Sequence, residues 1–67
     1  MKTDIITDPD IMDGLPVIRG TRIPVYIIIE MIEEGYSLDE IKREYPSLTI
    51  EQIKSAVHYA AELVSVG

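Results

Sequence analysis

The chain has 67 residues, no cysteine and a formal net charge of −6. A chain of this length holds one hydrophobic core, which buries about 60% of the unfolded surface and leaves stability marginal. The missing thiols exclude disulfides and thiolate-bound metal ions, so association with another copy or another protein is the remaining source of stability. The acidic balance argues against the broad basic surface of a typical nucleic-acid-binding protein.

Neither a signal peptide nor a membrane span is expected. The N-terminal residues lack the apolar stretch of a signal peptide. The longest uninterrupted apolar run, from Ile23 to Ile29, is far shorter than the ~20 residues that a membrane span needs. We therefore expect a cytoplasmic protein with no membrane partner.

The first predicted element is a short strand over residues 3–7, because β-branched residues precede the turn signal Asp8-Pro9. Val17-Ile18 predicts a second strand that pairs with the first, with a loop from Asp10 to Pro16 between them. A tight turn follows at Gly20-Thr21, since glycine permits backbone angles that other residues resist.

Pro24 is placed in the first turn of the first predicted helix, and Gly35 ends this helix as its natural C-terminal cap. Ile27 and Met31 widen its apolar surface beyond the need of one small core, so both are candidate oligomer contacts. The alternative is that the N-terminal ribbon covers this extra face. The predicted buried face repeats at i, i+3, i+4 and i+7, and consists of Val25, Ile28, Ile29 and Ile32.

Two capping boxes begin the next two helices, one at Ser37-Leu38-Asp39-Glu40 and one at Thr49-Ile50-Glu51-Gln52. The second helix ends at Tyr45-Pro46, because a residue before proline leaves the α region. Small residues in the third helix allow another helix to approach closely, which makes Ala60 a third candidate oligomer contact. The apolar residues of this helix are three and four apart: Ile50, Ile53, Val57, Ala60 and Val64.

These elements predict a single domain over residues 1–67 that is mainly α. Residues 1–24 form a two-stranded β ribbon and a turn, and residues 25–66 form three helices. The last two helices, joined by a short connection, resemble a helix-turn-helix with the third helix in the recognition position. The expected fold is therefore a β ribbon followed by a homeodomain-like three-helix bundle.

Arg19 and Arg22 flank the glycine turn and are the first candidate binding residues. Their planar guanidinium groups suit contact with DNA phosphates or with an acidic patch on a partner protein. Residues 1–24 carry three basic and four acidic side chains, against three and eight in residues 25–67, so any phosphate contact depends on these two arginines. The alternative is pairing with the chain's own acids Asp8, Asp10 and Asp13.

The exposed face of the third helix offers a second group of candidates for DNA or partner contact: Lys54, Ser55 and His58. Lys54 and His58 are four residues apart and share one side of the helix. Glu51 and Glu62 lie on the same side and repel phosphate, so an ordinary solvated face is the favoured interpretation. The four tyrosines are interpreted as core or rim residues with the hydroxyl near water.

No group of residues predicts catalysis, a cofactor or a metal ion. Asp8, Asp10 and Asp13 lack the glycine and the terminal glutamate of a calcium loop, and His58 is the only histidine. Neither a nucleophile–base pair nor a phosphate-binding glycine pattern is present. We expect a protein that is not an enzyme.

The run from Gly14 to Val25 has the pattern G-x-P-x-I-x-G-T-R-I-P-V. This pattern resembles the signature of a small prokaryotic family known as domain of unknown function 433. The resemblance continues in Asp8-Pro9, in residues 34–41 and in residues 45–49, and so covers nearly the whole chain. It implies a compact domain resembling a helix-turn-helix, often the antitoxin partner of a PIN-like ribonuclease toxin.

The resemblance leads to the first functional hypothesis, an antitoxin that binds operator DNA as a dimer and caps a PIN-like toxin with another surface. Because PIN-like nucleases use acidic metal sites, Arg19 or Arg22 is the side chain expected to enter that site. The alternative, favoured by the acidic balance, is a protein-interaction or oligomerisation module with a vestigial helix-turn-helix and no DNA role.

Overall fold

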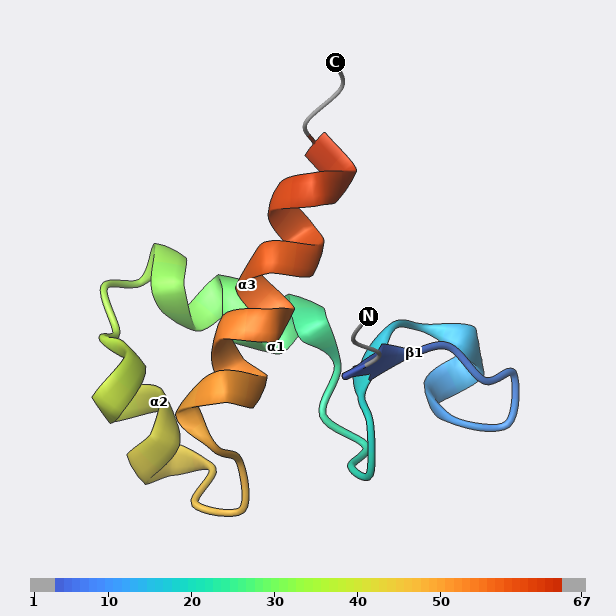
Figure 1. Cartoon of the computed structure of the whole chain (residues 1–67), viewed down its shortest axis with the longest axis horizontal. Coiled ribbons are helices and arrows are strands. Elements are labelled where there is room, and N and C mark those ends of the chain that lie inside the picture. Colours follow the sequence, from blue (N-terminus) through green and yellow to red (C-terminus); the bar gives the residue numbers. More distant parts are fainter. Residues whose placement is uncertain (1–3, 65–67) are drawn as a thin grey trace.

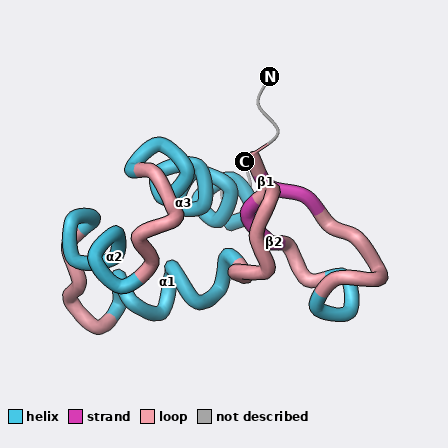
Figure 2. Tube along the Cα trace, turned by 90° about the horizontal axis from the view of Figure 1, so that it is seen from below, coloured by secondary structure: helices cyan, strands magenta, loops and turns pink. Residues whose placement is uncertain are grey.

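The computed structural model describes residues 4–64, with two short strands followed by three helices. The helices lie at one end of the molecule, and the N-terminal strands and turns lie at the other (Figure 2). This arrangement confirms the predicted fold class. Residues 3, 65 and 66 of the predicted elements lie outside the described residues. In chain order the elements are β1 (Ile5–Ile6), the 3-10 turn η1 (Met12–Gly14), β2 (Val17–Ile18), α1 (Val25–Glu33), α2 (Leu38–Glu44) and α3 (Ile50–Val64).

The antiparallel β ribbon is shorter than predicted. Ile5 pairs with Ile18 and Ile6 pairs with Val17, so β1 ends before Thr7. The reason is a turn centred on Asp8, whose carboxylate accepts from the Asp10 amide at 2.9 Å and whose carbonyl accepts from the Ile11 amide at 2.8 Å. These bonds form the turn predicted at Asp8-Pro9, with the Asp8 side chain capping it.

The connection between the strands contains η1, which the sequence patterns predict only as loop. Its three residues Met12, Asp13 and Gly14 all have positive φ, of 51°, 57° and 87°. Glycine adopts this left-handed region readily, whereas methionine and aspartate do so at a cost in conformational energy. The turn reverses the chain, so that Leu15 and Pro16 lead directly into β2.

The glycine turn after β2 is held by one threonine. Gly20 has φ +82°, and both the amide and the hydroxyl of Thr21 donate to the carbonyl of Ile18, at 3.0 and 2.7 Å. The same hydroxyl accepts from the Ile23 amide at 3.0 Å. The chain therefore folds back on β2, and Pro24 is the extended N-cap residue of α1 (ψ 148°), not a member of its first turn as predicted.

Helix α1 buries Val25 and Ile28, as predicted, but Ile32 is exposed. Met31 continues the i, i+3 line from Ile28 and packs against the core, so Ile32 turns toward solvent. Gly35 (φ +97°) ends the helix as predicted. The Gly35 amide donates to the Ile32 carbonyl and the Tyr36 amide to the Met31 carbonyl, both at 3.0 Å, which is a Schellman cap.

Both predicted capping boxes are present. The Ser37 amide donates to Glu40 Oε1 at 2.8 Å and the Glu40 amide donates to Ser37 Oγ at 3.1 Å. At the second box, the Thr49 amide donates to Gln52 Oε1 at 2.9 Å and the Gln52 amide donates to Thr49 Oγ1 at 3.0 Å. Local hydrogen bonds thus determine where α2 and α3 begin.

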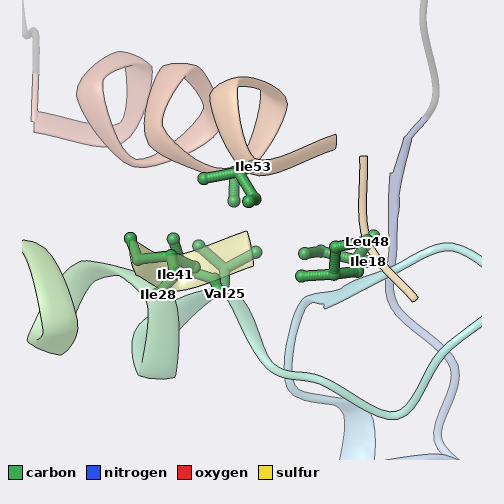
Figure 3. Close-up of a cluster of buried hydrophobic side chains, with 7 residues drawn as sticks. Ile18, Val25, Ile28, Ile41, Leu48 and Ile53 are labelled. Atoms are coloured by element: carbon green, nitrogen blue, oxygen red, sulfur yellow. The ribbon is translucent and has the colours of Figure 1, made fainter. Parts of the chain in front are cut away.

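The core joins all three helices to β2. Helix α3 packs on α1, with α2 on one side and the N-terminal segment on the other (Figure 1). Ile53 points from α3 toward the buried side chains of α1 and α2 (Figure 3). No helix within residues 4–64 is long and apolar enough to cross a membrane. The core cluster consists of Ile18, Val25, Ile28, Ile41, Leu48, Ile53 and Ala56.

Candidate binding surfaces

Three predicted candidates on α3, namely Lys54, Ser55 and His58, line one groove of about 360 Å³ between α3 and β1. We call it the polar groove. Ser55 is half-buried, contrary to the prediction of an exposed side chain. Its hydroxyl donates to Asp4 Oδ2 at 2.8 Å, so it ties α3 to the residue before β1 and is not available for a partner in this arrangement.

The charges of the polar groove are mixed and mainly negative. Three carboxylates, from Asp4, Glu51 and Glu62, line it beside a single lysine, Lys54. His58 Nε2 lies 3.1 Å from Glu62 Oε2, and both side chains are exposed. Because phosphates are repelled by carboxylates, the recognition position of α3 is electrostatically poor for DNA.

Arg19 and Arg22 are exposed on the glycine turn, and neither lines the polar groove. The Arg19 amide donates to the Asp4 carbonyl at 2.7 Å. Since the Asp4 carboxylate accepts from Ser55, Asp4 links this turn to α3. Within residues 4–64, Arg22 forms no ion pair with Asp8, Asp10 or Asp13, the acids considered as its alternative partners.

A second groove of about 380 Å³ lies between α1, α3 and the residues before β2. We call it the apolar groove. Its most exposed hydrophobic residues are Leu15 (41% exposed), Tyr26 (49%) and Leu63 (66%). Its charged lining residues are Glu30 and Glu33. An exposed apolar surface of this kind is typical of a protein contact.

The three predicted oligomer contacts do not share one groove. Ala60 lines the apolar groove, whereas Ile27 and Met31 do not. Met31 is half-buried against the core instead. Leu15, Tyr26 and Leu63 were not among the predicted contact residues, although each is a large apolar residue outside every predicted buried stripe. Tyr26 is also more exposed than a core residue.

Among residues 4–64, no cluster of three histidine, cysteine, aspartate or glutamate side chains has the arrangement of a metal site. The Asp8 carboxylate accepts a hydrogen bond from the Asp10 amide and so serves the local turn. The two grooves and the arginine turn are the surfaces that bring together the candidate binding residues.

Comparison with known proteins identifies relatives over most of the chain. The model of a family described as "protein of unknown function (DUF433)" matches residues 5–60. The uncharacterized protein y4eO of Sinorhizobium fredii (strain NBRC 101917 / NGR234) is 41% identical over 56 residues, which are 84% of this chain and 25% of that protein. This chain therefore spans only a quarter of the length of that relative.

The crystal structure of a DUF433 member from Anabaena variabilis ATCC 29413 has a similar fold, with a TM-score of 0.83 and 33% sequence identity. The alignment covers 94% of this chain and 61% of that one. The G-T-R-I-P-V run, whose threonine holds the turn between β2 and α1 and whose proline is the N-cap of α1, lies inside the matched region. The family match covers well over half of the residues, and the protein belongs to the DUF433 family.

Proposed function

We propose that this chain is an antitoxin-like binding module of the cytoplasm, not an enzyme, and that its main activity is to bind and neutralise a PIN-like ribonuclease. Family analogy supplies the ribonuclease. One structural observation supports the protein-binding role: an exposed arginine, Arg22, stands on a turn whose backbone is fixed around Thr21.

The turn gives Arg22 a defined starting position for a contact. Thr21 bonds to Ile18 and Ile23 on either side, so little backbone freedom is lost when a partner binds. A guanidinium group presents a planar fork of donors that matches a carboxylate. A nuclease site that holds its metal ions with carboxylates offers such acceptors, and Arg22 would occupy them in place of the metal.

A second candidate function is binding of operator DNA as a dimer, favoured by the arrangement of α2 and α3. The short connection between them and the exposed Lys54 on α3 fit a helix-turn-helix. The carboxylates of Asp4, Glu51 and Glu62 beside Lys54 oppose this function. For this reason we rank protein binding first.

Co-expression with a PIN-like ribonuclease encoded beside this chain tests the first function. We expect the chain to restore growth and to block RNA cleavage in vitro. Arg22→Ala should weaken the complex about tenfold or more, because it leaves acceptors on the partner unpaired. The matched control is Arg43→Ala, an exposed arginine on α2, which should leave the affinity unchanged. Failure of the wild-type chain to bind or inhibit the ribonuclease would refute the antitoxin role, and equal affinities of the two variants would refute the role of Arg22.

Fluorescence anisotropy with the duplex from upstream of the chain's own reading frame tests the second function. A scrambled duplex and a salt series are the controls. Genuine phosphate binding weakens with salt: for each tenfold rise in salt concentration, log K falls by about 0.9 per phosphate neutralised. Saturable, salt-dependent binding that prefers the native duplex would place DNA recognition above protein binding.

A further inference from the structure

The apolar groove exposes more hydrophobic surface than the fold of so short a chain requires. Leu63 is 66% exposed on the C-terminal half of α3, which extends beyond the other helices (Figure 1). Tyr26, 49% exposed, faces the same groove from the first turn of α1, and Leu15 is 41% exposed before β2. Two helices and the loop before β2 thus place apolar side chains around one open groove.

The charge at this groove has one sign. Its two charged lining residues, Glu30 and Glu33, are both exposed and both lie on α1. None of the described basic residues lines it. Lys42 donates to the carbonyl of Leu48 at 2.8 Å, Lys54 lines the polar groove, and Arg19 and Arg22 stand on the glycine turn. A segment that enters the groove therefore passes two carboxylates, and none of the basic residues within 4–64 lies beside them in the groove lining.

This charge distinguishes a second copy of the chain from a different partner. A two-fold dimer would use the same patch on both copies and would bring Glu30 and Glu33 of one copy toward those of the other. The net charge of −6 adds to that repulsion. A segment with apolar residues at helical spacing and with flanking lysines or arginines has the complementary pattern.

We infer that the apolar groove binds a short amphipathic segment of a partner protein. The apolar side chains of this segment enter between Tyr26 and Leu63, and its flanking basic residues pair with Glu30 and Glu33. This inference depends on the proposed function only in taking the partner to be a protein. It adds a second contact surface to the arginine turn and specifies the chemistry that surface recognises.

Two designed peptides test the inference on the full chain. Both carry leucines at i, i+3, i+4 and i+7, and their flanking residues are all lysine in one peptide and all glutamate in its twin. Anisotropy of the fluorescein-labelled peptides gives the affinities, and amide shifts of the ¹⁵N-labelled chain give the location. We expect the lysine peptide to bind about tenfold tighter or more, with shifts at Tyr26, Ile29, Ala60 and Leu63.

Matched substitutions separate local from overall effects. Glu33 is the last residue of α1 and Glu44 the last residue of α2, so Glu33→Lys and Glu44→Lys change net charge equally at equivalent helix positions. Only Glu33→Lys should weaken the lysine peptide, by about threefold. Tyr26→Ser should weaken it about tenfold. Tyr36→Ser, at an exposed tyrosine outside the groove, is the control for Tyr26.

Four results would overturn the inference: no binding at about 1 mM peptide, equal affinity for the twin peptides, equal effects of the two lysine substitutions, or shifts located in the polar groove. A concentration-dependent dimer that Leu63→Gln abolishes would also overturn it, since a second copy would then be the occupant.

Because these measurements use no ribonuclease, they are independent of the co-expression test. Expected peptide behaviour without ribonuclease binding would refute the proposed function and leave the groove assignment in place.

Discussion

The two grooves beside α3 differ in how many of their side chains already interact with another side chain of the protein. In the polar groove, the Ser55 hydroxyl is bonded to Asp4 and His58 lies against Glu62. In the apolar groove, Tyr26 and Leu63 are 49% and 66% exposed. Helix α3, which occupies the recognition position, therefore has its more exposed apolar side chains in the apolar groove, away from the polar groove. The position of a helix in a helix-turn-helix does not by itself show that the helix binds DNA.

Tyr59 separates these two surfaces. This half-buried residue lines both grooves and also packs against the core. On either side of it the pattern of α3 diverges, with Lys54 and His58 toward the ribbon and with Ala60 and Leu63 toward α1. The difference between the grooves is thus a difference between two faces of one amphipathic helix.

The largest expected effect comes from removing the core contact that supports both grooves. Ile53 is fully buried under α3, and Ile53→Ala should lower the free energy of unfolding by about 2–5 kcal/mol through lost burial and a cavity. Total stability for a chain of this length is on the order of 3–10 kcal/mol, so much of the protein should unfold. Urea denaturation followed by circular dichroism measures the change.

The control for Ile53→Ala lies on the same helix. Leu63→Ala removes a side chain that is 66% exposed and should change stability by less than about 0.5 kcal/mol. Similar losses for the two variants would mean that Leu63 is part of the folded core, which would contradict its assignment to an open groove.

The next prediction concerns the electrostatic difference between the grooves. Glu51→Gln with Glu62→Gln removes two carboxylates from the polar groove, and Glu30→Gln with Glu33→Gln removes two from the apolar groove. Both double variants change net charge equally. We expect affinity for a non-specific duplex at low salt to rise about fivefold for the first pair and much less for the second, because only the first pair lies beside Lys54.

Anisotropy at several salt concentrations measures this effect. If both double variants gain equally, the response follows net charge alone, and the polar face of α3 is no nearer to a nucleic-acid site than the apolar one. The carboxylates of the two grooves would then be electrostatically equivalent toward DNA.

Local features of the fold were predictable because each depends on a few consecutive residues. The two capping boxes, the cap at Gly35 and the Asp8 turn all follow from short patterns with their own hydrogen bonds. The turn η1 was not predictable, since Met12 and Asp13 adopt positive φ against their own preference. Ile32 was misassigned because the helical period gives the direction of a side chain but not where along α1 the other elements stop covering it.

The candidate site was less predictable, because its residues are far apart in sequence. Ser55 and Asp4 are 51 positions apart, so their hydrogen bond has no sequence signature. The apolar groove combines Leu15, Tyr26 and Leu63 from a loop and two helices that are far apart in sequence. Arg19 and Arg22 were predictable as exposed residues only because the adjacent glycine turn confines them to a surface loop.

A smaller effect is expected where the polar groove is joined to the ribbon. Ser55→Ala removes the bond to Asp4 and should cost about 1 kcal/mol, because the lost hydrogen bond is partly offset by the better helix propensity of alanine. Hydrogen exchange at the Arg19 amide, which donates to the Asp4 carbonyl, should also accelerate. Ser47→Ala, an exposed serine between α2 and α3, is the control and should change neither quantity.

The smallest predicted effect concerns the capping boxes of α2 and α3, which should differ in their response to acid. The capping box of α2 uses the carboxylate of Glu40. The pKa of Glu40 is lowered below its ordinary value of 4.5 by hydrogen bonds from the Ser37 amide and hydroxyl and, to a smaller extent, by the nearby Arg43 charge. The box of α3 uses Gln52, which does not titrate. Acid should therefore weaken the start of α2 and spare the start of α3.

The sign follows from linkage. Because the pKa of Glu40 is lower in the folded state, its contribution to stability is present above about pH 4.5 and is lost as the pH falls through the folded value. Glu40→Gln should keep the box but remove this pH dependence, and Gln52→Glu should add a second acid-sensitive box at α3. Urea midpoints between about pH 6 and pH 3 measure both. If Glu40→Gln and the wild type lose stability in parallel over this range, the acid response comes from other carboxylates, and the caps do not distinguish the two helices.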